Sequence, residues 1–205
     1  MVRSLLYKAL ENPVVFNVSQ AVLAPGTDYF LKQHYRKVFR DSGGLVLDVG
    51  CGPKPFTPNP DQGIMVGVDM SVPYAREYAQ HRARRGVAAM SERLPFKDNI
   101  FDETRCFGLL HHLNEQQAIV SLRELVRCTR PGGRIIVFDS VWPDVAILRP
   151  LPWLSHRFDR GRWMLTEKEL VKLLNKAYPD KWTYYRFTYT FYGHEALILT
   201  AVKEP

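Results

Sequence analysis

The chain has 205 residues, of which 46% are hydrophobic and 24% are charged. This length is enough for one domain with a full hydrophobic core, and the composition is that of a soluble globular protein, which excludes a disordered or fibrous chain. The formal net charge of +7 favours acidic partners, but it does not choose among nucleic acid, anionic lipid and a charged metabolite.

The cysteines and the amino terminus indicate the compartment. Cys51, Cys106 and Cys128 are odd in number, widely spaced and without a CxxC pair. This pattern argues against a disulfide framework and a zinc site, so we expect no metal and a cytoplasmic protein. Glu, Asn and Pro at residues 11–13 interrupt the amino-terminal apolar residues, which makes a poor signal-peptide core, and no run is long enough to span a membrane.

Residues 3–40 are predicted to form a helical cap. One apolar stripe begins at Leu5, and a later helix extends to Phe39. Pro13 and the Pro25-Gly26 pair are expected to break this region into separate helices.

After the cap, strand-like runs alternate with amphipathic helical patterns. The predicted order is strand 44–50, strand 64–70, helix 72–85, strand 86–90, strand 101–107, helix 114–129 and, after a Pro-Gly-Gly break, strand 134–139. Such alternation predicts a parallel sheet covered by helices on both faces. Arg82, Arg84 and Arg85 are expected to lie at the solvated end of a helix, because no nucleic-acid recognition motif accompanies them.

The carboxyl-terminal part follows a different pattern. A helix at about 166–177 has Thr166 as its predicted N-cap and Glu169 as the capping-box partner. Two strand-like runs, 182–192 and 194–202, are separated by little more than Gly193, so we expect an antiparallel hairpin. An α/β sheet that ends in such a hairpin is not the standard dinucleotide-binding fold.

The stretch DVGCGPKP, residues 48–55, follows the first predicted strand. Gly50 and Gly52 have no Cβ atom, so a ligand can lie against the backbone there. Asp69 ends the next strand, where a carboxylate can accept hydrogen bonds from both ribose hydroxyls. A dinucleotide would need a third glycine that opens a helix, whereas prolines follow here. The loop therefore favours a nucleoside without phosphates over NAD.

Four ordered motifs carry a resemblance to a known family. VLDVGCGPKP, VGVDMS, SERLPFKDNIFDETRCFGLLHHL and LRELVRCTRPGGRIIVFD resemble class I S-adenosylmethionine (SAM)-dependent methyltransferases, in particular the small-molecule branch that includes the ubiquinone/menaquinone-biosynthesis type. The resemblance covers residues 44–139, the expected cofactor-binding core. It implies a Rossmann-like, mostly parallel seven-stranded sheet with helices on both faces and a C-terminal antiparallel hairpin, which is a three-layer α/β/α fold. We expect a single domain over residues 1–205, completed by the helix and hairpin of residues 166–205.

The resemblance also implies which residues bind the cofactor, with S-adenosylhomocysteine as the product. Asp48, Gly50, Cys51 and Gly52 would line the methionine part of SAM, and Asp69 would hold the ribose. The adenine would lie among a set of residues after the second and third strands: Met70, Met90, Ser91 and Glu92. Phe107 and Gly108 would lie beneath the sulfonium.

Two positions depart from the family pattern. Many relatives have an aspartate at the position of Met90, so the adenine contact would come here from Ser91, Glu92 or the backbone. Lys54 replaces the third glycine, and the helix after it is expected to be absent. Lys54 has two interpretations: it reaches the carboxylate of the methionine tail, or it points to solvent.

Methyl transfer from a sulfonium needs alignment and the exclusion of water more than it needs a catalytic side chain. A hydroxyl acceptor would gain from a base, and His111 and His112 follow the fourth strand near the expected methyl group. The alternative for both histidines is a packed, hydrogen-bonded role at the start of the next helix.

Residues 140–165 are too long for an ordinary connection and are predicted to be an insertion over the acceptor pocket. The candidate acceptor-binding residues are four from this insertion and one from the amino-terminal helices: Trp142, Trp153, Arg157, Trp163 and Tyr29. Aromatic rings beside arginines suit a small molecule with an apolar or ring portion and an anionic group. The alternatives are a surface flap with packed tryptophans and a peripheral contact with a membrane that admits a lipid-like acceptor.

The predicted function is therefore transfer of a methyl group from SAM to a small-molecule acceptor, at oxygen or carbon. The alternative is a SAM-binding protein without activity that serves as a regulatory partner. A nicotinamide oxidoreductase is disfavoured by the loop, and a nucleic-acid methyltransferase is indicated only by the net charge. The sequence does not predict an oligomeric state.

Overall fold

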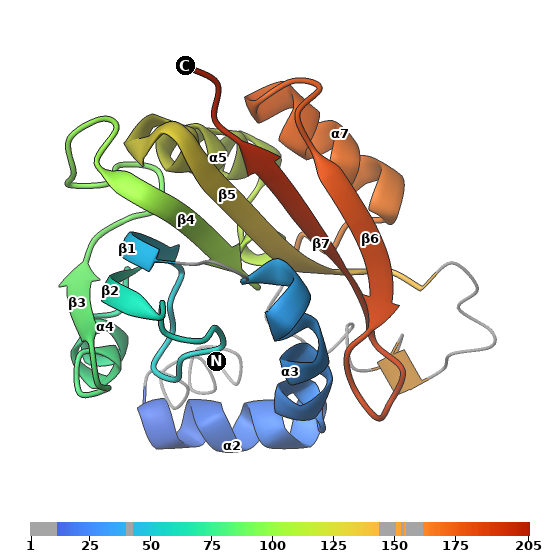
Figure 1. The fold of residues 1–205 in the computed structure, drawn as a ribbon. Coiled ribbons are helices and arrows are strands. Elements are labelled where there is room, and N and C mark those ends of the chain that lie inside the picture. Colours follow the sequence, from blue (N-terminus) through green and yellow to red (C-terminus); the bar gives the residue numbers. More distant parts are fainter. Residues whose placement is uncertain (1–11, 40–42, 144–150, 153, 155–161) are drawn as a thin grey trace.

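A seven-stranded sheet forms the centre of the computed structural model, which describes residues 12–39, 43–143, 151–152, 154 and 162–205 (Figure 1). Its strands are β1 (Gly43–Val49), β2 (Gln62–Asp69), β3 (Arg84–Ala88), β4 (Phe101–Phe107), β5 (Thr129–Val141), β6 (Thr183–Thr188) and β7 (Glu195–Val202). Their order across the sheet is β3-β2-β1-β4-β5-β7-β6. The pairs among the first five strands are parallel, and β7 is antiparallel to both β5 and β6. The predicted mostly parallel sheet with an antiparallel hairpin is confirmed.

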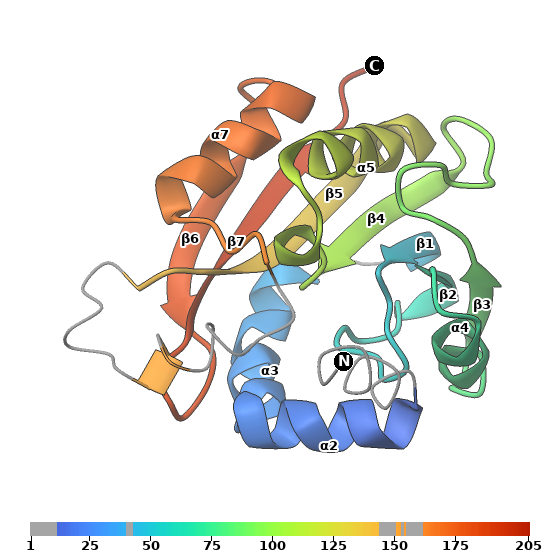
Figure 2. The ribbon, with the colours of Figure 1, turned by 180° about the vertical axis from the view of Figure 1, so that it is seen from behind.

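Helices cover both faces of this sheet (Figures 1 and 2). They are α2 (Pro13–Leu23), α3 (Thr27–Val38), α4 (Val72–Tyr78), the single 3₁₀ turn η1 (Leu110–His112), α5 (Glu115–Cys128) and α7 (Glu167–Ala177). The two views from opposite sides show α5 and α7 in front of the sheet in Figure 2 and α3 in front of it in Figure 1.

Side chains of β5 divide the core between the two faces. Ile135 and Val137 belong to the larger buried cluster, which includes leucines of α5 and α7. Ile136 and Phe138 belong to the cluster that contains Leu31 of α3. This alternation follows from the period of two along a strand, and it explains why consecutive residues of the apolar run 135–138 are all buried although they face opposite sides of the sheet.

The helix ends follow local sequence signals. Thr166 and Glu169 form the predicted capping box of α7, in which the Thr166 amide donates to the Glu169 carboxylate at 2.8 Å. Asn114 and Gln117 form an equivalent box at the start of α5. Pro13 is the first residue of α2 rather than an internal break, a position where a missing N–H costs nothing.

The region after β2 differs from the prediction. Helix 72–85 was expected, but α4 ends at Tyr78, and β3 begins at Arg84. Ala83 has a positive φ of 59°, which turns the chain from the helix into the strand. Arg84 is 3% exposed, so the prediction that it lies at a solvated helix end is wrong, whereas Arg82 and Arg85 are exposed.

The connection between β1 and β2 contains no helix, as the prolines predicted. Residues 50–61 cross between the two neighbouring parallel strands as irregular chain. At the other end of the molecule, β5 includes the Pro131-Gly132-Gly133 break, and its pairing with β4 shifts register there. Among the described residues, no helix is long and apolar enough to cross a membrane.

Candidate functional site

A cleft of about 810 Å³ lies at the carboxyl ends of β1, β2 and β4. This is where the strand order reverses between β1 and β4, the usual place for a ligand in an open α/β sheet. The cleft is lined by Phe16, Gly50, Gly52, Asp69, Met70, Ser71, Val72, Pro73, Tyr74, Gly108, Leu109, His112, Arg162 and Trp163. Its volume falls within the range of roughly 300–1,000 Å³ that is typical of small-molecule sites.

The two glycines after β1 give this cleft its shape. Gly50 and Gly52 have φ angles of +74° and +59°, which favour glycine. A Cβ atom on Gly50 would lie 2.9 Å from the Cβ of Leu109, whereas one on Gly52 would meet nothing within 4 Å. The backbone of Gly52 therefore borders open space, as a ligand that lies against the chain requires.

Asp69 ties this loop to the neighbouring strand end. The Gly52 amide donates to Oδ2 of Asp69 at 3.1 Å, and the Ser71 amide donates to Oδ1 at 2.8 Å. The side chain of Asp69 also lines the cleft. The carboxylate predicted to hold a ribose is thus located beside the glycine predicted to hold the methionine part.

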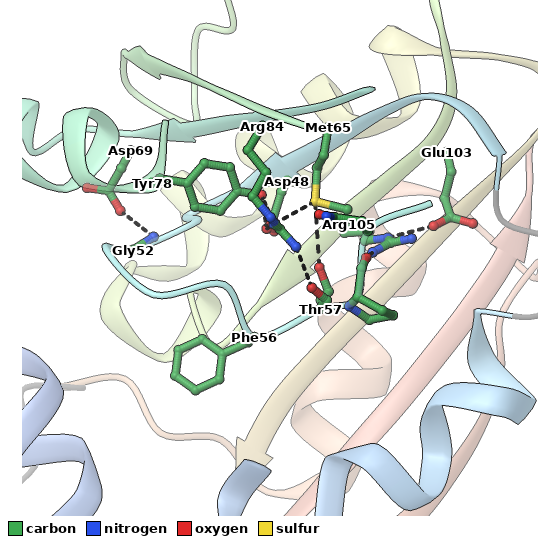
Figure 3. A network of polar contacts seen from close by, with 12 residues as sticks. Asp48, Gly52, Phe56, Thr57, Met65, Asp69, Tyr78, Arg84, Glu103 and Arg105 are labelled. Atoms are coloured by element: carbon green, nitrogen blue, oxygen red, sulfur yellow. Dashed lines mark hydrogen bonds and ion pairs between the residues drawn. The ribbon is translucent and has the colours of Figure 1, made fainter. Parts of the chain in front are cut away.

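Asp48 is buried beneath the loop and is not among the residues that line the cleft (Figure 3). Its Oδ2 accepts a hydrogen bond from the Tyr78 hydroxyl at 2.8 Å and lies 3.9 Å from the Arg84 guanidinium. Burial raises the pKa of the Asp48 carboxyl, and the Tyr78 hydrogen bond and Arg84 oppose this shift. These contacts give Asp48 a role in the support of the loop rather than in the lining of the cleft.

Cys51 is also buried, in a cluster with Val46, Met65 and Tyr78. Burial raises the pKa of its thiol, and the nearby carboxylates of Asp48 and Asp69 raise it further. A neutral thiol in such surroundings packs and does not act as a nucleophile. All three cysteines are free and buried, and the described residues hold no group of three or more potential metal ligands.

The predicted adenine-contacting residues fall in two places. Met70 is 77% exposed and lines the cleft. Met90, Ser91 and Glu92 follow β3 and are not among the lining residues. Ser91 and Glu92 instead form hydrogen bonds with α5, through Ser121 at 2.8 Å and Gln117 at 3.0 Å.

A second, smaller cavity of about 100 Å³ adjoins the cleft. It is lined by Phe16, Gln20, Leu23, Ala24, Thr27, Phe56, Phe107, Gly108, His111, His112, Phe138, Ser140, Tyr189 and His194. Phe16, Gly108 and His112 line both spaces, so the two meet beside Gly108. Phe107, which was predicted to lie under the sulfonium, lines only the second cavity.

His111 is held in the wall of this cavity by a buried carboxylate. Its Nδ1 lies 2.5 Å from Oδ1 of Asp139, which is 1% exposed. The other carboxylate oxygen accepts the backbone amide of Leu110 at 2.6 Å, so Asp139 fixes both the turn and the ring. The Cε1 edge of His111 lies 3.9 Å from the place where a Cβ on Gly108 would stand. His112 is exposed and lies against the His111 ring, with 4.1 Å between the ring centroids.

Polar groups from β5 and from the connection between β6 and β7 complete the wall of the cavity. The hydroxyls of Ser140 and Tyr189 are 2.6 Å apart, and Thr190 Oγ1 lies 2.7 Å from Nδ1 of the buried His194. The described lining contains four phenylalanines but no lysine, arginine, aspartate or glutamate. The cavity therefore suits a neutral, ring-like group with an oxygen or nitrogen at its edge.

The predicted acceptor-binding residues are not gathered in this cavity. Tyr29 is 59% exposed and stacks on Phe191, and Trp163 lines the larger cleft. The backbone and indole N–H groups of Trp142 donate to the carbonyls of Leu165 and Met164. Trp153 and Arg157 lie outside the described residues.

Lys54 is exposed, which agrees with the interpretation that it points to solvent. Its ammonium group forms an ion pair with Asp28 of α3 at 2.5 Å, and both side chains are about half exposed. Lys54 does not line the cleft.

Several residues of the site were not predicted from the sequence. Phe16 and Gln20 of α2 reach the site because the amino-terminal helices lie over the strand ends. Asp139 ends the apolar run RIIVFD, and a carboxylate in a buried strand is the signal that could have identified it.

Comparison with known proteins agrees with this arrangement. Residues 47–137 match a family model described as a methyltransferase domain. The chain is 34% identical over 140 residues to demethylmenaquinone methyltransferase of Mycolicibacterium paratuberculosis; the match covers 64% of this chain and 57% of that protein. It is 32% identical over 101 residues to a human protein named as probable tRNA methyltransferase 9B, which covers 49% of this chain and 22% of that protein. The chain thus spans little more than half, or less, of the length of these curated relatives.

Solved structures share the fold. A SAM-dependent methyltransferase from Thermotoga maritima superimposes with a TM-score of 0.70 and 16% identity, over 96% of this chain and 99% of that chain. At this level of identity, the likeness concerns the fold.

Proposed function

This chain belongs to the class I SAM-dependent methyltransferases, and on that premise we propose that it transfers a methyl group from SAM to a small-molecule acceptor. The observation that carries the proposal is the junction of the two spaces at Gly108. One space borders the glycine loop and Asp69, and the other contains His111. A donor and an acceptor bound in these spaces would face each other across that junction.

The residues of the larger cleft suit SAM in kind and in position. Gly50 and Gly52 leave room for the methionine part, and Asp69 offers a carboxylate to the ribose hydroxyls. Met70 extends into the same cleft as an apolar surface for the adenine. When bound, SAM would supply an activated methyl group, and its transfer would leave S-adenosylhomocysteine.

His111 would take the proton that the acceptor loses. Asp139 binds Nδ1 of His111 and fixes the ring, and the proton transfer is assigned to the other ring nitrogen, Nε2. An ionised Asp139 would stabilise the charged imidazole that results. The phenylalanines of the cavity would exclude water, which would otherwise solvate the acceptor.

The acceptor cavity favours a neutral group over an anionic one, because its described lining contains no basic side chain other than histidine. Its volume of about 100 Å³ is smaller than the ~150 Å³ cavity that holds a benzene molecule, so it accommodates only the reacting part of an acceptor. Demethylmenaquinone is the first compound to test, because the name of the Mycolicibacterium relative states it for that protein.

Titration calorimetry with SAM, S-adenosylhomocysteine and NADH tests the cofactor assignment. We expect binding of the two sulfur nucleosides and none of NADH, and the absence of binding by SAM would overturn the proposal. A radiolabelled methyl-donor assay with demethylmenaquinone and with transfer RNA then tests the acceptor. Methylation of transfer RNA alone would replace the small-molecule acceptor, and SAM binding without turnover on either would favour the regulatory alternative.

A further inference from the structure

Residues 50–61 supply groups to both parts of the site. Gly50 and Gly52 line the larger cleft, and Phe56 lines the smaller cavity. This segment, here called the cofactor loop, contains prolines at positions 53, 55, 58 and 60. A proline has no N–H group, so the loop cannot form the hydrogen-bond ladder of a helix, and its carbonyl groups need other partners.

Three consecutive carbonyls of the cofactor loop accept hydrogen bonds from side chains of three different elements, and Figure 3 labels the two arginines among these donors. The hydroxyl of Tyr35, on α3, donates to the carbonyl of Phe56. Arg84, at the start of β3, donates through Nη2 to the carbonyl of Thr57 at 2.6 Å. Arg105, on β4, donates through Nη1 to the carbonyl of Pro58 at 2.7 Å.

Both arginines are oriented by further partners. The guanidinium of Arg84 also donates to the Tyr78 hydroxyl and lies over the Tyr78 ring, 4.8 Å from its centroid. Arg105 is fully buried; its Nε donates to Glu103 at 2.6 Å, and its guanidinium lies 4.2 Å from the centroid of the Phe39 ring. Each guanidinium is thus fixed in a plane that directs one N–H group at the loop.

Buried arginines are costly unless their charge and donors are satisfied. Here, Asp48 and Glu103 balance the charge, and the loop carbonyls accept hydrogen bonds from Nη2 of Arg84 and Nη1 of Arg105. The proline-rich loop and the two arginines therefore complete one another's hydrogen bonding.

We propose that Arg84, Arg105 and Tyr35 are positioning residues that hold the cofactor loop in its binding conformation, in the place where a helix would otherwise do so. The inference rests on the proposed function, because SAM is the ligand that the loop would hold. Loss of one of these hydrogen bonds frees the loop, so a smaller fraction of molecules is competent to bind.

The test compares Tyr35→Phe and Arg105→Gln with a matched control, Arg134→Gln. Arg134 also approaches Glu103, at 3.6 Å, and also donates to a backbone carbonyl, but that carbonyl belongs to Val38 of α3. The measurements are the dissociation constant of SAM by calorimetry and the amide hydrogen exchange of residues 50–61 without ligand. Both are made well below each variant's unfolding temperature.

We expect SAM binding to weaken by about three- to tenfold in Tyr35→Phe and by roughly ten- to a hundredfold in Arg105→Gln, with faster exchange in the loop. Arg134→Gln should change neither quantity, even if it lowers the unfolding temperature. Tyr35→Phe removes one hydroxyl and leaves no unpaired buried charge, so we expect this variant to fold. It therefore decides the test if Arg105→Gln does not fold.

The inference is overturned if Tyr35→Phe, and Arg105→Gln where it folds, show unchanged SAM affinity and unchanged amide hydrogen exchange in the cofactor loop. If the wild-type chain binds no SAM, the proposed function fails, and the exchange rates alone decide whether these residues hold the loop.

Discussion

Nδ1 of His111 lies 2.5 Å from Oδ1 of Asp139, and the two residues are 8% and 1% exposed. They come from η1 and from β5, the strand next to β4, so the sheet itself brings them together. A histidine with one ring nitrogen fixed by a carboxylate is suited to accept a proton at the other.

Replacement of His111 tests this role. We expect His111→Asn to lower kcat by about 100-fold or more, because a positioned base contributes roughly 10²–10⁴ to such steps. The dissociation constant of SAM should stay within about twofold of wild type. Single-turnover kinetics and calorimetry measure the two quantities. Unchanged turnover would assign His111 to packing and leave alignment as the main catalytic factor.

Gly52 tests the location of the cofactor. In Gly52→Ala, the new methyl group would project into the cleft, so SAM affinity should fall by about tenfold or more. The positive φ of +59° should also cost about 1–2 kcal/mol of stability. Gly132→Ala is the control, since Gly132 has a φ of +74° and also borders open space, but lies at the start of β5 away from the cleft. Equal loss of affinity in both variants would contradict the assignment.

Tyr189 tests the smaller cavity. Removal of its hydroxyl in Tyr189→Phe breaks the 2.6 Å contact with Ser140 and alters the polar wall. We expect kcat/KM for the acceptor to fall by about two- to tenfold, while SAM affinity stays unchanged. Tyr184→Phe, at an exposed tyrosine of β6 that lines neither space, provides the control. An effect on SAM affinity alone would contradict the assignment of this cavity to the acceptor.

The hydrogen bonds of Glu124 should make the stability of the fold depend on pH. Its hydrogen bonds from Arg127 and then from the Leu94 amide lower the pKa of its carboxyl, although partial burial opposes them. A lowered pKa stabilises the fold above the unfolded value of about 4.3, and the stabilisation is lost as the pH falls through the folded pKa below it. Glu124→Gln should therefore reduce the free energy of unfolding by roughly 1 kcal/mol at pH 7 and by less below about pH 4. Urea unfolding at both pH values measures the difference, and an equal loss at both would contradict the assignment.

Local patterns predicted most of the fold. The predicted bounds of the fourth strand, residues 101–107, match those of β4 in the structure. The capping box of α7 follows from the spacing of Thr166 and Glu169. The absence of a helix after β1 followed from the prolines, because proline restricts its own backbone whatever surrounds it.

The site was less predictable, because its contacts join distant parts of the chain. The sequence around Arg84 resembles a solvated helix end, yet its partner carbonyl at Thr57 lies 27 residues away. Asp139 and His111 are 28 residues apart and meet only because β4 and β5 are neighbours. No local period encodes such pairs, whereas Gly50, Gly52 and Asp69 follow directly from strand ends and could be located.

The way in which the cofactor loop is held also determines when it becomes ordered. A helix in this position would form through hydrogen bonds between residues that are close in sequence, within about a microsecond. The carbonyls of Thr57 and Pro58 instead accept hydrogen bonds from arginines that are 27 and 47 residues further along the chain, on β3 and β4. Contacts of such long separation form late in folding. A chain emerging from the ribosome would therefore complete its ligand site only after β4 has joined the sheet. Partial unfolding at β3 or β4 would disrupt that site first.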